Sequence, residues 1–353
     1  MTPSLSASDT SRLDAITDAA VEMAATNVAD LLAMAIEHRP ADAALVVCDT
    51  DSWLNIVLTE AYRRALPEAP FIDFGAVAPG DVLAAFAQLA PGSLVVLIQS
   101  SSFRLEAFRI RIELFKRGLK VIEHVHLARM PGVQGLHYIA SLAYDPAYYR
   151  GVGHKLKQRI DRASHGMVDS GDGEKLVFAS PFEPAKLNIG DYSDMKNVGG
   201  QFPIGEVFTE ARDLEAVNGC VRIFVFGDTA FMVNRPEHPI TLMIDKGRVV
   251  AVIGATPEFD TVLAQIRAHE GEVWVRELGF GMNRAFSRQQ MVNDIGTYER
   301  MCGIHLSLGA KHGVYAKPQF KRKDTRFHVD VFAVTEGVYL DDELVYRDGA
   351  WIV

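Results

Sequence analysis

Acidic and imidazole side chains that could bind metal ions recur in strand-like segments of the second half of the chain. They are Glu206, Glu277, His305, His328 and Asp330. At least one apolar residue or glycine adjoins each of them, and a polar group buried in such surroundings needs a partner. Taken singly, each has a plainer explanation, such as a hydrogen-bonded core histidine or a carboxylate in an ion pair. Taken together, three carboxylates and two imidazoles suit Zn²⁺, Mn²⁺, Co²⁺ or Fe²⁺.

His328 and Asp330 form the sharpest of these local patterns. They lie two residues apart in an apolar run, 326–334, that is typical of a β-strand. Side chains at positions i and i+2 of a strand point the same way, so the imidazole and the carboxylate should lie side by side. A hydrogen-bonded pair is one outcome and a metal site is the other. Two ions a few ångströms apart would share a bridging carboxylate, and such a pair polarises a carbonyl and activates water.

The segments that carry these residues resemble the motifs of the aminopeptidase T family of dinuclear metallopeptidases. The family motif N-L-P-x-G-E-V-F is similar to residues 197–208, E-L-G-I-G-x-N to 277–283, G-T-V-H-I-A-L-G to 303–309, and H-x-D to 328–330. The order and approximate spacing agree over residues 170–353. The resemblance implies two divalent ions, zinc, cobalt or manganese, held by the five side chains named above.

The same resemblance implies roles for individual residues. Glu206 would bridge the two ions, and a metal-activated water would attack the carbonyl of a small peptide or amide substrate. A glutamate that precedes the family's histidine motif is a candidate general base, and Glu299 is the nearest here. The family places a metal-site tyrosine seven residues after the histidine, where this sequence has His312, with Tyr315 close by. Because members of the family tend to pair, the resemblance also implies a homodimer.

The chain length and His312 favour a second interpretation. The chain is shorter than a typical aminopeptidase of this family and nearer in length to the 2,5-dihydroxypyridine dioxygenases, distant relatives that cleave a ring with one iron(II) ion. Those enzymes keep the H-x-D pair but carry a histidine where Glu277 stands, whereas this sequence keeps both glutamates. We therefore favour the metal-dependent hydrolase. A mononuclear iron(II) dioxygenase of an N-heteroaromatic substrate is the first alternative, and a repurposed, non-catalytic member that binds a peptide or metabolite is the second.

Composition and charge argue against several classes of protein. Of the 353 residues, 48% are hydrophobic and 23% are charged, which suits a globular protein of two domains. The net charge of −9 is spread along the chain, so no nucleic-acid partner is expected. The sequence lacks both a long apolar run and the apolar core of a signal peptide, so we expect no membrane span. Three scattered cysteines, Cys48, Cys220 and Cys302, favour a reducing, cytoplasmic location.

Residues 1–168 are expected to form an open parallel α/β domain. Short apolar runs alternate there with helical patterns, which favours parallel crossovers. The strands are expected at 44–48, 71–74, 94–98 and 120–126. No glycine-rich cofactor fingerprint follows them. His124 and His126 share a face of the last strand, but two histidines make an incomplete metal site and a structural role is favoured.

Residues 169–353 are expected to form a mixed α+β domain that carries the metal site. The turn cluster 170–173 marks the boundary between the two domains. Strand patterns dominate beyond it, with a hairpin over 240–253 that turns at Asp245-Lys246-Gly247 and a helix over 256–270. The tail segment 338–345 is typical of another hairpin.

Overall fold

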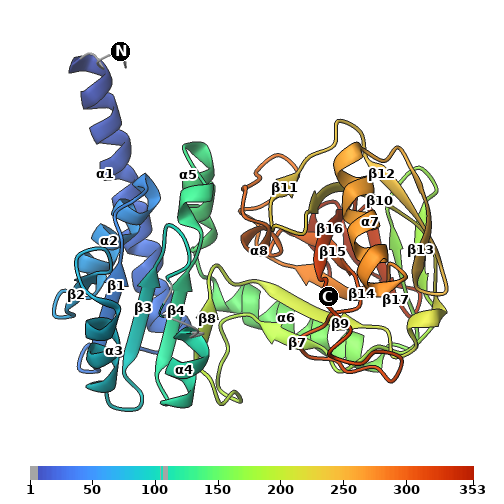
Figure 1. Cartoon of the computed structure of the whole chain (residues 1–353). Coiled ribbons are helices and arrows are strands. Elements are labelled where there is room, and N and C mark those ends of the chain that lie inside the picture. Colours follow the sequence, from blue (N-terminus) through green and yellow to red (C-terminus); the bar gives the residue numbers. More distant parts are fainter. Residues whose placement is uncertain (1–6, 104, 106–109) are drawn as a thin grey trace. The chain divides into compact units, whose positions relative to one another are not determined.

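The computed structural model describes residues 7–103, 105 and 110–353 and divides the chain into two compact units (Figure 1). The first unit comprises the chain up to residue 146, together with 190–204 and 290–292. The second unit comprises 147–189, 205–289 and 293–353. The division expected after residue 168 stays a prediction about domain boundaries. In the structure, residues 147–168 are part of the second unit.

The first unit is built on a parallel sheet, as the alternation of strands and helices predicted. Its strand order is β2-β1-β3-β4-β8, and every neighbouring pair is parallel. The strands are Ala44–Cys48 (β1), Phe71–Asp73 (β2), Leu94–Ile98 (β3), Lys120–His124 (β4) and Gly199–Gln201 (β8). The helices are Ala7–Asp30 (α1), Leu31–Ala35 (η1, a π-helix), Trp53–Ala65 (α2), Pro79–Ala87 (α3), Ile110–Lys116 (α4), Leu127–Arg129 (η2) and Val133–Ser141 (α5).

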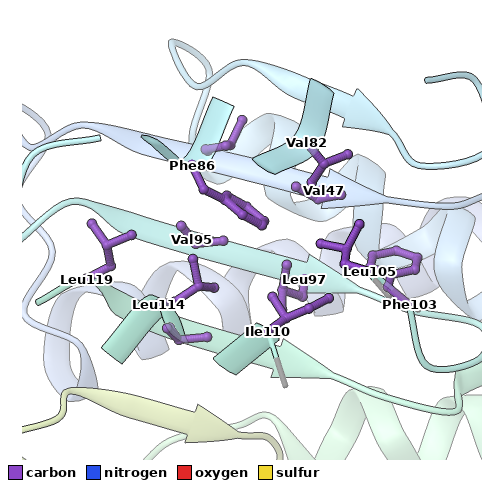
Figure 2. Packing of buried hydrophobic residues seen from close by; sticks show 12 residues of the cluster. Val47, Val82, Phe86, Val95, Leu97, Phe103, Leu105, Ile110, Leu114 and Leu119 are labelled. Carbon is purple, nitrogen blue, oxygen red and sulfur yellow. The ribbon is translucent and has the colours of Figure 1, made fainter. Parts of the chain in front are cut away.

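Buried side chains on one side of this sheet form an apolar core (Figure 2). Val47 of β1 and Val95 and Leu97 of β3 pack there against Phe86 of α3 and Leu114 of α4. Every residue of β3 is buried. A strand that is covered on both faces reads as a continuous apolar run, which is why its bounds could be predicted to the residue.

His124, at the end of β4, is part of a buried hydrogen-bonded network in this unit. Tyr138 donates its hydroxyl proton to the carbonyl oxygen of Phe202 at 3.1 Å, so its oxygen accepts from His124 Nδ1 at 2.7 Å. His124 Nε2 then accepts from the hydroxyl of Tyr62 at 2.8 Å. Burial lowers the pKa of His124 to about 3, so the ring is neutral. The network gives His124 the structural role favoured from the sequence.

The second unit is dominated by an antiparallel sheet with the strand order β19-β18-β17-β5-β6-β10-β16-β15-β14-β9-β7. Outside this order, β11 and β12 also pair with the interior strand β10, and β13 pairs with β12. The strands are Gly166–Asp169 (β5), Lys175–Phe178 (β6), Lys186–Asn188 (β7), Glu206–Glu210 (β9), Val217–Gly227 (β10), Val233–Asn234 (β11), Ile240–Asp245 (β12), Arg248–Ile253 (β13), Val275–Gly281 (β14), Gly303–Leu308 (β15), Val329–Ala333 (β16), Gly337–Leu340 (β17), Glu343–Arg347 (β18) and Ala350–Trp351 (β19). This mixture of helices and an antiparallel sheet agrees with the α+β expectation.

The helices of this unit are Pro146–Arg162 (α6), Leu214–Ala216 (η3), Pro257–Glu270 (α7) and Ile295–Tyr298 (α8). Local sequence sets both ends of α7. The Thr256 side chain accepts a hydrogen bond from the Phe259 amide, Pro257 fills the first helical turn, and Gly271 ends the helix with φ of 80°. A cap of this kind stabilises a helix by about 1 kcal/mol. In the described part of the chain, no helix is both long and apolar enough to cross a membrane.

Candidate metal centre

The register of three neighbouring strands places predicted ligands on one face of the antiparallel sheet. Gly281 of β14 pairs with Glu206 of β9, and Gly279 pairs with His305 of β15. Glu277 lies two residues before Gly279, and residues two apart on a strand point to the same face. The side chains of Glu206, Glu277 and His305 therefore meet, although they come from distant parts of the sequence.

Strand β16 brings the last two predicted ligands to this face. His305 pairs with Phe332, two residues after Asp330, so Asp330 lies on the same face of the sheet as His305. His328 precedes the first residue of β16 and is not part of the strand that its alternation with Asp330 suggested. The two side chains still meet, with 3.1 Å between His328 Nε2 and Asp330 Oδ1.

Gly279 is required by the packing of His305. A Cβ atom at this position would lie 2.0 Å from Cε1 and 2.1 Å from Nε2 of the imidazole. Such distances are far inside the contact distance of non-bonded heavy atoms. The ring of His305 therefore lies directly over the backbone of β14. Only a residue without a Cβ atom leaves room for the ring, which explains the glycine in the E-L-G-F-G segment.

The ligand atoms form two groups of three. Glu206, Glu299 and His305 make one group, and Glu277, His328 and Asp330 make the other. Within each group, one ligand atom of each residue lies within 4.8 Å of the others. His305 links the groups, because its Nε2 lies 3.3 Å from Glu206 Oε1 and 3.4 Å from Glu277 Oε1.

The two other histidines of the site differ in which nitrogen carries the proton. His328 Nδ1 lies 3.2 Å from the carbonyl oxygen of Lys311 and must donate to it, which leaves Nε2 as the nitrogen that faces Asp330. His312 Nδ1 instead accepts from the amides of Val314 and Tyr315 at 3.0 and 3.3 Å, so its proton is on Nε2, 2.9 Å from Glu277 Oε2. His328 thus suits a metal ligand, whereas His312 suits a residue that orients Glu277.

Several buried polar atoms of the site lack a hydrogen-bond partner among the described residues. They include both ring nitrogens of His305 and Oδ1 of Asp330. The contacts of these atoms with neighbouring acids are close but do not have hydrogen-bond geometry. An unsatisfied buried polar atom is costly, and a bound cation would satisfy His305 Nε2 and Asp330 Oδ1. The donor set of nitrogen and carboxylate oxygen therefore fits a divalent metal.

Arg300, which the sequence did not mark as a site residue, lies inside the group formed by Glu206, Glu299 and His305. Arg300 Nη1 is 2.8 Å from Glu206 Oε2 and 2.6 Å from Glu299 Oε2. Its side chain is only 8% exposed. The nearest signal in the sequence is that Arg300 directly follows Glu299, but local sequence gives no reason to expect a contact with Glu206, 94 residues away.

The charges of the site shift the pKa values of its members in opposite directions. Burial opposes ionisation of Glu277, but His305 and His312 outweigh it and lower the pKa. Burial raises the pKa of Glu299 to about 8, and the Glu206 and Asp330 carboxylates add to the rise while Arg300 opposes it. The raised pKa makes Glu299 a better proton acceptor than an ordinary glutamate, so it is a candidate to carry a proton.

Tyr315, the remaining candidate, uses its hydroxyl elsewhere. It donates to the carbonyl oxygen of Pro184 at 2.8 Å, and the carbonyl oxygen of Phe208 lies at 3.3 Å. Its ring lies beside His312, with 4.9 Å between the ring centroids. The structure thus gathers the other predicted residues at the two ligand groups and places Tyr315 behind His312.

A cavity of about 610 Å³ lies beside the second ligand group. His328 is part of its wall and is 30% exposed, whereas the side chains of Glu277 and Asp330 are each 9% exposed. Lys311 and Arg326 give the wall positive charge. Further lining residues are Asp228, Phe231, Gln265, His269 and Phe327.

Glu270, at the end of α7, fixes the segments around this cavity. Its Oε1 accepts from the amides of Arg326 and Phe327 at 2.6 and 2.8 Å, and its Oε2 accepts from the amide of Ala310 at 2.7 Å. These bonds hold the backbone on either side of the loop that leads to His328. The sequence offered no signal for this role, because a glutamate in the last turn of a helix is common.

Comparisons with known proteins find the fold but no family. No family model matches the chain, and no curated protein sequence matches it. The 2,5-dihydroxypyridine dioxygenase of Pseudomonas putida KT2440 is similar in structure, with a TM-score of 0.61 and 15% identity over 95% of this chain and 97% of that one. Wild-type AmpT from Thermus thermophilus is similar with a TM-score of 0.57 and 14% identity, over 94% and 99%. These likenesses establish a distant fold relationship.

Proposed function

We propose that the chain is a metal-dependent hydrolase that cleaves a peptide or amide bond in a small substrate. The observation that carries this proposal is the convergence of Glu277, His328 and Asp330 beside a cavity, with His328 Nε2 only 3.1 Å from Asp330 Oδ1. The fold likeness to AmpT supports it, as does the resemblance of the motifs to the aminopeptidase T family.

A divalent ion held by these three side chains would polarise a carbonyl and lower the pKa of a water molecule. The protein's own residues would do the rest. The imidazole of His312, whose Nε2 lies 2.9 Å from Glu277 Oε2, would keep this carboxylate in place. Glu299 would take the proton of the attacking water and pass it to the leaving amine. Lys311 and Arg326 would receive an anionic group of the substrate in the cavity.

The test combines metal content with turnover. Protein purified without chelator should contain a divalent metal, and protein loaded with zinc, manganese or cobalt should hydrolyse at least one of a panel of amino-acyl amides. His328→Ala should lose both the metal and the activity. The exposed His165, which faces Asp341 and Asp342, provides a matched control, and His165→Ala should change neither. A fully metallated sample that is inactive toward every amide would contradict the hydrolase.

A mononuclear iron(II) dioxygenase is the second candidate, and a specific observation favours it. Arg300 engages two carboxylates of one ligand group, which leaves the other group for a single ion. The fold likeness to the Pseudomonas putida dioxygenase adds support. Oxygen uptake with a dihydroxypyridine, by protein loaded anaerobically with iron(II), would favour this candidate over the hydrolase. No uptake under those conditions would remove it.

A further inference from the structure

Arg300 lies where a second metal ion would have to bind. The group formed by Glu206, Glu299 and His305 has the residue types of a metal site. Two of its three members, however, already share one cation, because Nη1 of Arg300 contacts Oε2 of both glutamates at 2.8 and 2.6 Å. A metal ion at this group would need the same carboxylates and would stand next to a fixed positive charge.

The backbone around Arg300 keeps the guanidinium in this position. Asp294 caps the short helix α8, because its carboxylate accepts from the amide and the hydroxyl of Thr297 at 3.0 and 2.9 Å. The carbonyl oxygen of Arg300 accepts from the amide of Asn283 at 2.8 Å. With its backbone anchored and its side chain 8% exposed, Arg300 cannot move into solvent without breaking buried contacts.

The second ligand group has no such cation. Among the described residues, the ion-pair contacts of Glu277 and Asp330 are with imidazoles and not with lysine or arginine. His328 Nε2 faces Asp330 Oδ1 at 3.1 Å, and Asp330 Oδ1 lacks a hydrogen-bond partner there. A divalent ion at this group would find two carboxylates and one imidazole, a complete set of three protein ligands with room for water or substrate.

We infer that the guanidinium of Arg300 takes the place of a second metal ion, so that the centre binds one divalent ion, at Glu277, His328 and Asp330. This inference rests on the proposed metal dependence. It is independent of whether the reaction is hydrolysis or ring cleavage. It also changes the expected role of Glu206, which pairs with Arg300 and does not bridge two ions.

The inference is tested by counting bound ions. Chelator-treated protein is titrated with Zn²⁺ by calorimetry, and the bound metal is measured after equilibrium dialysis. The wild type should bind one ion per chain. Arg300→Gln removes the cation and should bind two, whereas Arg300→Lys keeps a positive charge and should bind one. His328→Ala should lose the ion that the wild type binds.

The outcomes separate the inference from the proposed function. Two ions in the wild type would overturn the inference and leave metal dependence standing, whereas no ion in the wild type would overturn both. One ion in a folded Arg300→Gln variant would show that Arg300 is not what excludes the second ion.

A second pair of variants decides the point if Arg300→Gln does not fold. Losing a residue that only hydrogen-bonds to a metal ligand typically weakens metal binding by up to ~100-fold. Glu277→Gln removes a ligand, so it should weaken Zn²⁺ binding by more than this. Glu206→Gln should weaken Zn²⁺ binding by less than this. Equal losses in both variants would place Glu206 among the ligands and would overturn the inference.

Discussion

Replacing Gly279 with alanine tests the packing on which the site is built. The added methyl carbon would lie 2.0 Å from Cε1 of His305, whereas non-bonded carbons prefer about 3.5–4.0 Å, so the imidazole must move away by roughly 1.5 Å. Gly279 does not have a positive φ, so the effect is steric and not one of backbone conformation. Forcing extra volume into a packed interior costs about 1–3 kcal/mol.

The change should appear in both stability and metal binding. In a domain of this size, each kcal/mol lowers the melting temperature by about 2–4 °C. Because His305 Nε2 lies only 3.3 and 3.4 Å from Glu206 and Glu277, the shifted ring would disturb both carboxylates, and Zn²⁺ affinity should fall. Thermal unfolding of chelator-treated protein measures the first effect, and calorimetry measures the second.

A double-mutant cycle makes the reasoning refutable. His305→Ala removes the ring that the new methyl group meets, so Gly279→Ala should cost much less in that background. Gly313→Ala is the matched control, since a Cβ there meets nothing within 4 Å. If the cost of Gly279→Ala is the same with and without the imidazole, the proposed contact is not the cause and the account of this strand is wrong.

Three further changes probe other features. Glu210→Gln leaves the buried cation of Arg276, 2.8 Å from the carboxylate, without its counter-charge, while Lys317 keeps Glu183, so urea unfolding should show a loss of about 3–5 kcal/mol. His124 has a folded pKa of about 3 against 6.5 unfolded, so the unfolded state binds more protons between those values. Stability should therefore fall by about 1.4 kcal/mol per pH unit as the pH drops through that window, and a His124→Gln variant should lose this component. Lys311→Ala should raise KM for a substrate with an anionic group while kcat changes little, and a proportional loss in kcat would place Lys311 nearer the chemistry.

The sequence predicted best those features that depend on neighbours along the chain. Strands β1 and β3, which are buried except at Ala44, have the bounds expected from their apolar runs, and the hairpin of β12 and β13 turns at Asp245-Lys246-Gly247. His328 was placed inside a strand because apolar residues surround it, but the strand begins one residue later. The prediction that His328 and Asp330 lie side by side is still confirmed, because His328 Nε2 is 3.1 Å from Asp330 Oδ1.

Features that depend on distant partners could not be predicted. Arg300 contacts Glu206 across 94 residues, and no local pattern distinguishes an arginine that neutralises a ligand group from one that faces solvent. The different proton positions of His328 and His312 likewise depend on which backbone groups face their Nδ1 atoms. A motif gives the type of a ligand, whereas its protonation and its charge balance come from the folded structure.

The proposed ligands come from separate parts of the chain, Glu277 from β14 and His328 and Asp330 from the start of β16, so metal binding is a measure of folding. Neither of these strands alone supplies a site, so an unfolded chain or a fragment that ends before β16 would bind the ion weakly. An ion that binds only the folded state stabilises it in proportion to the logarithm of its free concentration. Metal supply would then set how much of this protein is folded and survives proteolysis in a cell, as well as how fast it works.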